Sequence, residues 1–459
     1  MELNIEYIFI LCVLYIIDIG DDLMNNHMEI PWHEYTKVNS KVKIEDASLT
    51  EKSSVIGRIG LMLLACGTGA WRVRSSMNTI ASELNITCIA DIGLTNISYT
   101  CIDGIESHAQ SLSLHNTSVN TSKLARMEDF VYHFKDECKT CTCNEIHDQL
   151  DQIESIHSSY SPIILGLAAA LACSCFTFLL GGGPIEMLCA FVGAGLGNTL
   201  RMKLIKHNYT LFLNVAASVS LACLVYALLF NFLEACFGIA TQHEAGYICS
   251  MLFIIPGFPF ITSGIDLAKL DLRSGLERLA YAIIIILAAT LTAWICALVL
   301  HLQPVDFVKL HISTSTKLLL RLLTSFGGVF GFSIMFNSSK KIASSAGYIG
   351  AIANTLRLTL VDLSLPAAAA AFIGALTAGL LASMIKGNTG YPRIAVTVPS
   401  IVIMVPGLYM YRAIYNLELT STMSIGANWL IQSLLIVLAL PMGLIFARIL
   451  TDPSFRYCT

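Results

Sequence analysis

Long, nearly uninterrupted apolar stretches run from residue 161 to the C-terminus and predict membrane-spanning helices. A helix that crosses a bilayer needs about 20 predominantly apolar residues. Ten candidate stretches lie near 161–180, 185–204, 211–232, 245–263, 279–300, 318–337, 341–361, 366–385, 394–414 and 426–450. The pattern is therefore typical of an α-helical polytopic membrane protein.

Residues 48–158 have a different pattern, which predicts a small α+β domain. Residues 48–51 (Ser-Leu-Thr-Glu) have the spacing of a capping box that begins a helix, and Gly67-Thr68-Gly69 interrupts this helix. Residues 86–114 are rich in β-branched side chains and predict two or three strands. Two polar helices are expected next, at about 123–136 and 144–157.

The segment 1–47 contains one apolar stretch, from Ile5 to Ile19, with Glu6 and Asp18 inside it. No Lys or Arg precedes this stretch, which is unlike a signal peptide, and the stretch is short for a membrane span. Three interpretations stay open: a peripheral or poorly ordered segment, an additional membrane helix, or a cleaved signal.

Composition narrows the class of protein. Of 459 residues, 55% are hydrophobic and only 13% are charged, whereas soluble domains carry about 25% charged residues. This low charge argues against an ordinary cytosolic enzyme, and it excludes a nucleic-acid-binding protein and a disordered scaffold. Many of the 15 cysteines lie inside apolar runs, and we expect them to be reduced.

Charge is distributed unevenly and predicts the orientation in the membrane. The net charge is −11 over residues 1–160 and +7 over residues 161–459. If the acidic domain is cytoplasmic, the loops on its side hold 12 Lys and Arg, against 5 on the other side. The positive-inside rule favours this orientation, with the N-terminal domain and the C-terminus both cytoplasmic.

An internal repeat divides the membrane part into two modules, 159–303 and 304–459. Gly-Leu-Gly-Asn-Thr-Leu-Arg at 195–201 recurs as Ala-Ile-Ala-Asn-Thr-Leu-Arg at 351–357, and Pro256-Gly257 recurs as Pro406-Gly407. Each copy occupies the second and fourth helix of a five-helix module. Because five is odd, the second module must insert upside down, which predicts two inverted five-helix repeats.

The repeated Pro-Gly steps predict a substrate site. Proline breaks or kinks a helix, and backbone groups freed at membrane depth are tolerated where they line a cavity or are buried in protein. We therefore expect Pro256, Gly257, Pro406 and Gly407 to surround one central site near the midplane. The alternative is that both steps are structural kinks that only improve packing.

The repeated Asn-Thr-x-Arg residues are further candidate substrate ligands. Asparagine offers a donor and an acceptor, and an arginine guanidinium matches a carboxylate. The candidates are Asn198, Thr199 and Arg201 in the first copy, and Asn354, Thr355 and Arg357 in the second. The alternative is that both arginines are interfacial anchors at helix ends, and Lys203 and Lys206 favour this for Arg201.

Few acidic residues lie in or beside the predicted spans. Glu186, Asp266 and Asp362 are candidates for carrying a proton, although solvated loop charges are the alternative for each. The sequence contains no Walker-type loop, so we do not expect ATP hydrolysis by this chain to drive transport. No cofactor is predicted. Cys138, Cys141, Cys143 and His147 form one cluster that zinc could occupy; unliganded cysteines and a redox pair are the alternatives.

The chain resembles the threonine/serine exporter family. The resemblance rests on residues 67–73, on Pro256-Gly257-Phe258-Pro259 with Gly264 and Asp266, and on residues 350–357 and 405–407, and it covers roughly 50–452. It implies a cytoplasmic amphipathic domain, ten membrane helices, and export of threonine and serine driven by the proton motive force. In some members the two modules are separate polypeptides, and such split relatives are associated with succinate export.

The leading hypothesis is a secondary active exporter of small polar amino acids in the cytoplasmic (inner) membrane. Its partners would be the small-molecule substrate, protons and the lipid bilayer, with no nucleic acid and no catalytic residues. Export of a C4-dicarboxylate such as succinate is the alternative, because two symmetry-related arginines suit two carboxylates. A channel, and a membrane-anchored enzyme or sensor, are weaker alternatives. The sequence does not determine the substrate, the coupling stoichiometry or the oligomeric state.

Overall fold

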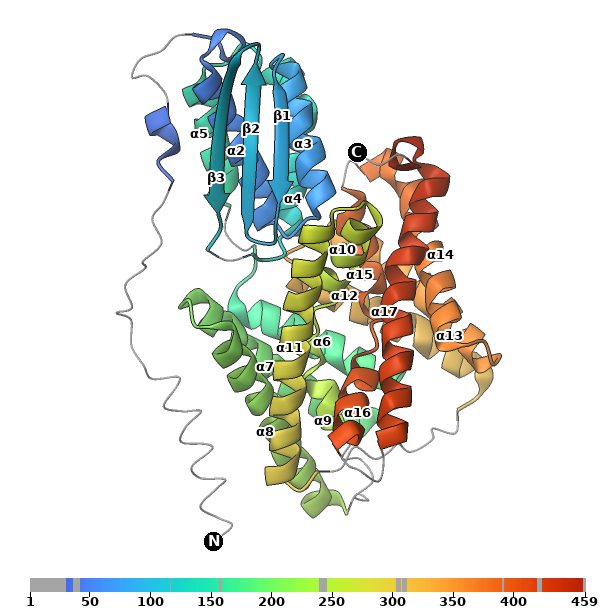
Figure 1. Ribbon diagram of the computed structural model, residues 1–459. Helices are drawn as coiled ribbons and strands as arrows, with labels where there is room; N and C mark the ends of the chain where they lie inside the picture. The colour runs from blue at the N-terminus through green and yellow to red at the C-terminus, as the bar shows by residue number, and fades with distance from the viewer. Residues whose placement is uncertain are drawn as a thin grey trace.

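The computed structural model describes residues 30–35, 42–115, 117–156, 159–238, 246–302, 307, 312–389, 392–418 and 423–456. The apolar stretch at 5–19 lies outside the described residues. The described chain forms a smaller unit that contains the sheet and a larger, all-helical unit beneath it (Figure 1).

The first α-helix described in the smaller unit is α2 (Leu49–Ala65), and the predicted capping box at its start is confirmed. The Ser48 side chain accepts a hydrogen bond from the Glu51 backbone N–H, and the Glu51 carboxylate accepts one from the Ser48 N–H at 2.9 Å. The predicted interruption is confirmed as well: α2 ends at Ala65, Gly67 adopts a φ of +79°, and α3 (Ala70–Glu83) begins after Gly69. A positive φ of this size is readily adopted by glycine alone.

Three antiparallel strands follow, in the order β1-β2-β3, as the sequence predicted. Every second residue of β1 is buried, so the sheet has one inner face, which packs on α2 and α3. The remaining elements of the unit are two helices and two short 3-10 helices. The bounds are β1 (Thr87–Ile92), β2 (Asn96–Asp103), β3 (Glu106–Ser113), α4 (Thr121–Glu137), α5 (Cys143–Glu154), η1 (Trp32–Tyr35) and η2 (Ile44–Asp46).

The larger unit contains helices at all ten positions where the sequence predicts apolar stretches. Eight positions hold one continuous helix each, and the other two hold a bent pair. The bounds are α6 (Pro162–Leu179), α7 (Pro184–Lys206), α8 (Leu211–Phe237), α9 (Gly246–Ser250), η4 (Leu252–Ile254), α10 (Gly257–Ala268), α11 (Leu272–Val299), α12 (Thr314–Met335), α13 (Lys340–Asp362), α14 (Ala367–Thr389), α15 (Arg393–Val402), α16 (Gly407–Glu418), α17 (Met423–Thr451) and η6 (Pro453–Arg456).

Among the described residues, six helices are long and apolar enough to cross a membrane, or eight if each bent pair counts as one span. Helices α7 and α13, which carry the repeated Asn-Thr-Leu-Arg, are not among the eight. The predicted helix breaks are confirmed: the chain bends by 57° at Pro256 and by 48° at the segment that ends with Pro406. Missing proline donors and clashes with the preceding turn explain both bends.

The two halves of the helical unit pack in matching ways. Helix α6 contacts α7 as α12 contacts α13, α8 contacts α11 as α14 contacts α17, and the half-helix after each break contacts the last helix of both halves. Helices α6 and α12 also pack on each other in opposite directions. Gly331 faces Ala168 and Gly327 faces Cys175, so the two helices are antiparallel.

Several helix ends lie together against the smaller unit. The Thr121 hydroxyl, at the start of α4, lies 2.7 Å from the Ser338 hydroxyl between α12 and α13. Arg273 of α11 forms an ion pair with Asp91 of β1, and the Tyr160 hydroxyl before α6 donates to the Ser338 carbonyl at 2.9 Å. The start of α6, the α10–α11 turn and the α12–α13 turn therefore share one side of the helical unit.

Candidate functional site

The two Pro-Gly breaks lie directly against each other. A Cβ atom added at Gly257 would lie 3.0 Å from a methyl carbon of Val402, and one added at Gly407 would lie 1.8 Å from the terminal carbon of Ile255. Each glycine therefore contacts the residues that precede the other break. The absence of a side chain at these two positions allows the bent segments to approach so closely. The two copies of the Pro-Gly repeat therefore contact each other at the centre of the helical unit.

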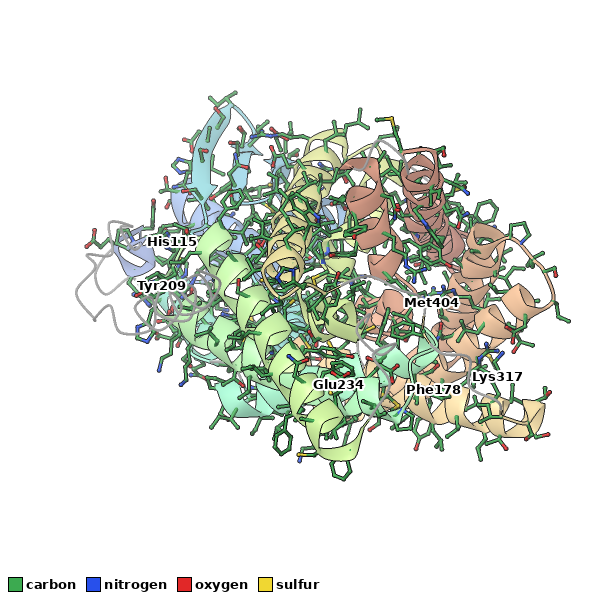
Figure 2. The ribbon with its side chains drawn as sticks, turned by 90° about the horizontal axis from the view of Figure 1, so that it is seen from below. His115, Phe178, Tyr209, Glu234, Lys317 and Met404 are labelled. Carbon is green, nitrogen blue, oxygen red and sulfur yellow. The ribbon has the colours of Figure 1, made fainter. Side chains whose placement is uncertain are left out.

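The segment between α15 and α16 lies inside the helical unit. Figure 2 shows Met404 of this segment among the helices, whereas Lys317 at the start of α12 lies toward the periphery. Met404 is fully buried, as are Val402 and Val405 beside it. A small apolar cavity between Ile255, Thr290, Gly407 and Met410 adjoins the crossing point. The breaks are therefore enclosed by protein.

The two predicted asparagines occupy matching places. Both are buried on the second helix of their half, and each donates its amide to the helix that precedes it. The Asn198 Nδ2 donates to the Leu165 carbonyl and the Asn354 Nδ2 donates to the Ser325 hydroxyl, each at 2.9 Å. The remaining oxygen differs: Asn354 Oδ1 accepts from Arg357, whereas Asn198 Oδ1 is buried without a hydrogen-bond partner among the described residues.

The two predicted arginines lie beside the breaks. Arg201 donates to the carbonyl of Phe253, which precedes Pro256 by three residues, at 3.4 Å. Arg357 donates to Asn354 at 3.2 Å, and its Nε is buried without a partner among the described residues. The Gly374 of α14 faces both the Arg357 side chain and Met404 of the second break. Each arginine thus lies between its own helix and the bent segment of its own half.

The two predicted threonines differ in whether their hydroxyl groups already have a hydrogen-bond partner among the described residues. The Thr199 hydroxyl donates to the Gly195 carbonyl at 2.7 Å and faces Gly166 on α6, so it lies in the α6–α7 contact. The Thr355 hydroxyl is buried and has no partner among the described residues. Thr355 is therefore the threonine that retains hydrogen-bonding capacity.

Tyrosines from both halves meet beside the breaks, which the sequence did not indicate. The Tyr247 hydroxyl of α9 lies 2.7 Å from the Tyr411 hydroxyl of α16, and both side chains are buried. The rings pack edge to face with centroids 5.9 Å apart. Two tyrosines in apolar helices resemble ordinary core residues, so no local signal could have paired them.

Of the three predicted acidic candidates, Asp266 has the most connected environment. Its side chain is fully buried at the end of α10, where one carboxylate oxygen accepts from the Ala70 N–H at 3.2 Å and from the Ser274 hydroxyl at 3.0 Å. Arg278 of α11 lies 3.2 Å from the same oxygen. Asp266 Oδ1 is buried without a hydrogen-bond partner in the described part of the chain.

Arg278 extends this group into the smaller unit. It donates to the Gly67 carbonyl at 3.2 Å and to the Thr68 carbonyl at 2.7 Å, while Gly69 approaches Asp266 so closely that a Cβ there would lie 2.5 Å from Oδ1. The helix interruption at 67–69 therefore fits onto the Asp266–Arg278 pair. This contact connects the smaller unit to the half-helix that begins at Gly257.

The other two acidic candidates lie elsewhere. Glu186 is buried at the start of α7 and accepts from the Gly183 N–H at 2.9 Å, which is the role of a helix cap. Asp362 ends α13, and its side chain is 44% exposed and paired with Lys317 and Arg321. Since α13 begins beside the smaller unit at Ser338, Asp362 lies at the opposite end of the helical unit.

Two family models match the chain, and together they cover both of its halves. The model described as "Putative threonine/serine exporter" matches residues 54–300, and the model described as "Threonine/Serine exporter, ThrE" matches residues 321–450. The first alone spans more than half of the 459 residues. The chain belongs to the threonine/serine exporter family. The boundary between the two models falls between α11 and α12, where one half of the exporter ends and the other begins.

Relatives of the exporter agree with this assignment. A "Probable threonine/serine exporter" of Mycobacterium tuberculosis is 22% identical over 90% of this chain and 79% of its own length. An "Uncharacterized protein" of Haemophilus influenzae is 26% identical over 33% of this chain and 56% of its own length. No solved structure matches. Six to eight helices of the described residues are able to cross a membrane, and together with the family they indicate that the chain is a multi-pass membrane protein.

Among the described residues, the cysteine cluster of the smaller unit does not have the arrangement of a metal site. Cys138, Cys141 and Cys143 are free, and burial raises the pKa of the Cys138 and Cys143 thiols to about 12, which disfavours the thiolate that zinc requires. Among the described residues, the group with metal-ligand spacing is the exposed set His33, Asp148 and Asp151. His147 instead contacts Ser54 at 3.1 Å and Arg58 at 3.4 Å.

Proposed function

We propose that this protein exports small polar amino acids, threonine and serine, from the cytoplasm, driven by the proton motive force. The observation that carries the proposal is the reciprocal contact of the two Pro-Gly breaks. Broken helices that meet are a recurrent substrate site of secondary transporters. The family, and the name of the M. tuberculosis relative, support the substrate class.

In this proposal α6–α11 and α12–α17 are two inverted five-helix repeats that cross the inner membrane ten times in total. The matching contacts of the two halves and the opposite directions of α6 and α12 support this arrangement. The smaller unit and the C-terminus lie in the cytoplasm, as the excess of Lys and Arg in the loops on that side favours. Helices α7 and α13 are less apolar because they line the interior.

The substrate lies at the crossing of the breaks, flanked by α7 and α13. Its carboxylate lies toward Arg357, since the buried Nε of this guanidinium has no partner among the described residues, and toward the N-terminal ends of α10 and α16. Its ammonium group lies toward Asn198 Oδ1 and the carbonyls freed at the breaks. Arg201 contributes less, because it already donates to the Phe253 carbonyl.

Asp266 is the group that carries the proton. One of its oxygens is held by Ala70, Ser274 and Arg278, whereas Oδ1 has no partner among the described residues and can accept a proton. Protonation weakens the attraction to Arg278, and Arg278 is the side chain that holds the carbonyls of Gly67 and Thr68. The smaller unit therefore acts as a gate that senses the proton, and it is not an enzyme.

Counterflow in proteoliposomes tests the proposal. Vesicles loaded with unlabelled serine or threonine should accumulate labelled threonine, and vesicles loaded with succinate should not. An imposed pH gradient should drive threonine in the parent, whereas Asp266→Asn should retain counterflow and lose the response to the gradient. Asp362→Asn is the matched control and should keep both. Counterflow with succinate alone would replace the amino-acid proposal by the dicarboxylate alternative, and counterflow with neither solute would refute export of both.

A further inference from the structure

A second cavity lies on the side of the smaller unit, apart from the crossing of the breaks. Its wall combines Trp71 of α3 with residues of α10, α14, α15, α17 and η6, among them Arg393, Arg448 and Phe455. The enclosed space measures about 30 Å³. At about 10–15 Å³ for one water molecule, this is room for a group about the size of two water molecules. The elements α3, α10, α15 and α17 come together here beneath the smaller unit (Figure 1).

The cavity lies along the same half-helix as the first break. Thr262 and Ile265 of α10 line it, and they follow Gly257 by five and eight residues. At 1.5 Å per residue, α10 separates the cavity from the break by roughly 8–12 Å. The wall on the opposite side is α15, the helix that leads into the second break. A solute in this cavity lies between the same two half-helices that meet at the breaks.

Arg393 is a buried cation held by neutral groups. Its side chain donates to the Thr451 hydroxyl at 2.8 Å and to the Gly379 carbonyl at 2.7 Å, and the residue is 8% exposed. In the described part of the chain no carboxylate lies within ion-pair distance of it. Burying a charge is costly, and the carboxylate that attracts Arg393, on Asp452, is shared with Arg448, so an anion in the cavity would stabilise the guanidinium.

Arg448 presents a second guanidinium with unused donors. Its Nε is buried and has no hydrogen-bond partner among the described residues; the nearest carboxylate oxygen, on Asp452, is 3.7 Å away. The guanidinium carbon lies 4.5 Å from the ring centroids of both Trp71 and Phe455. Rings that cover the faces of a guanidinium leave its N–H edge available for a carboxylate.

The charge balance around the cavity is positive. Lys269 lies 4.0 Å over the Phe455 ring and donates to the Phe455 carbonyl at 2.8 Å. Among the described residues, Arg448 lies near two carboxylates, Asp452 and Glu128, and Glu128 is already paired with Arg72. Apolar side chains such as Ile265 and Leu444 supply the rest of the wall. Two arginines in an otherwise apolar pocket are suited to one small carboxylate.

We propose that this cavity binds the carboxylate of a small solute before it reaches the breaks, with Arg393 and Arg448 as its ligands and Trp71 as the lid that the smaller unit supplies. The identity of the solute as threonine or serine rests on the proposed function; the carboxylate site itself rests on the cavity and its two arginines. Trp71 makes the smaller unit part of the binding site.

Tryptophan fluorescence of the purified full-length protein in detergent tests the site. L-Threonine and acetate should change the emission, because a carboxylate on Arg448 alters the ring contact of Trp71. L-Threoninol, which has the same amine and side chain but a hydroxymethyl group in place of the carboxylate, should not. The response should vanish in Trp71→Phe and persist in Trp429→Phe. A response to threoninol equal to that to threonine, or one that persists in Trp71→Phe, overturns the proposal.

Variants of the arginines provide the second measurement. Arg448→Gln should weaken threonine and acetate binding by about 10- to 150-fold, as expected for losing a hydrogen bond to a charged group. Arg448→Lys should recover only part of the affinity, because lysine restores the charge but lacks the two parallel N–H donors with which a guanidinium binds a carboxylate. Arg456→Gln, an exposed arginine of the same segment that does not line the cavity, is the matched control. Parent-like binding by Arg448→Gln, or equal weakening in Arg456→Gln, overturns the proposal.

The outcomes for this site and for the proposed function are separable. Asn198→Ala and Asn354→Ala alter the crossing of the breaks and should leave the Trp71 response intact. A Trp71 response to acetate without any counterflow of threonine would keep the carboxylate site and refute the export proposal. Counterflow of threonine without a Trp71 response to any carboxylate would keep the export proposal and refute this site.

Discussion

Asp266 and Arg278 form an ion pair that is closed off from solvent: the Arg278 side chain is 4% exposed and the Asp266 side chain 0%. The pair lies on α10 and α11, and besides Ser274 of α11 its hydrogen bonds go to Gly67, Thr68 and Ala70 of the smaller unit. A buried pair of this kind needs hydrogen bonds from the groups around it, and the residues at and beside the helix interruption supply three of them, while Asp266 Oδ1 has no partner among the described residues. The pair therefore joins the two units.

Asp266→Ala should destabilise the protein strongly. It leaves Arg278 buried without its counter-charge, which costs about 3–5 kcal/mol. The readout is the apparent unfolding midpoint of the purified protein, because a chain with two units is not expected to unfold in two states. Asp362→Ala is the control, and it should shift the midpoint little since its partners and its own side chain are partly exposed. Equal shifts for both variants would mean that the pair at Asp266 has no special role.

His147 should make the smaller unit sensitive to acid. Burial and the adjacent Arg58 guanidinium lower the pKa of His147 from 6.5 to about 3. The geometry agrees: Arg58 donates to Nδ1, so Nε2 carries the hydrogen that is donated to Ser54. The folded pKa is below the unfolded one, so the stability is fully present above pH 6.5 and declines as the pH falls toward 3.

This decline should amount to about 1.4 kcal/mol per pH unit at most. The measurement is the apparent unfolding midpoint of the parent and of His147→Gln between about pH 5 and 7. The variant cannot take up the proton on unfolding, so its midpoint should change less with pH. His133→Gln, on the exposed surface of α4, should behave like the parent. Parallel pH profiles for the parent and His147→Gln would contradict the assignment.

Local chemistry explains which features the sequence predicts. The capping box at Ser48 depends on residues three positions apart, and the breaks at Pro256 and Pro406 depend on a missing backbone donor. Both were predictable because each cause lies within one turn of its effect. The interruption at 67–69 was predictable for the same reason, but its contact with Asp266 was not.

Partners that are distant in sequence could not be predicted. Asn198 donates to the Leu165 carbonyl, and a backbone acceptor carries no residue-specific signal. Tyr247 finds Tyr411 only because the two breaks cross, and the Thr199 hydroxyl is satisfied within its own helix. These contacts depend on tertiary packing, which overrides what each residue type suggests locally.

The Tyr247–Tyr411 hydrogen bond should couple the two halves. Tyr247→Phe and Tyr411→Phe each remove the same bond and should each destabilise by about 0.5–1.5 kcal/mol. The double variant should be about as stable as either single variant, because the bond can be lost only once. Apparent unfolding midpoints of all four proteins complete the cycle. Additive effects would show that the two hydroxyl groups do not interact in the membrane.

A shorter side chain at position 255 should compensate for the destabilisation that a side chain at position 407 causes. Gly407→Ala puts a carbon 1.8 Å from the terminal carbon of Ile255 and should cost about 1–3 kcal/mol. Ile255→Val removes that terminal carbon, so the double variant should recover stability and transport relative to Gly407→Ala alone. Gly257→Ala is the control: its added carbon meets Val402 at 3.0 Å, and Ile255→Val should not rescue it. Equal rescue of both alanine variants would mean that the breaks do not meet as described.

The final prediction concerns the asparagines beside the breaks. Asn198→Ala and Asn354→Ala should each weaken threonine binding by about 10- to 150-fold if each loses one hydrogen bond to a charged group. The amide nitrogens already hold α6 and α12, so a loss of packing must be separated from a loss of binding. Asn198→Asp keeps both the shape and the oxygen that faces no partner among the described residues. It replaces the donor to Leu165 by a second oxygen and adds a negative charge that attracts the ammonium group, so it should bind threonine better than Asn198→Ala does.

Arg357→Ala should weaken binding more than Arg201→Ala, since Arg201 is already used by the Phe253 carbonyl and Arg357 retains an unpartnered Nε in the described structure. Equilibrium binding of threonine to purified variants with parent-like unfolding midpoints decides the question. If both asparagine variants bind threonine as the parent does, the repeated Asn-Thr-Leu-Arg sequences only pack α7 against α6 and α13 against α12. The substrate would then bind without them, and the search for ligands would move to the carbonyls at Phe253 and its counterpart in the second break.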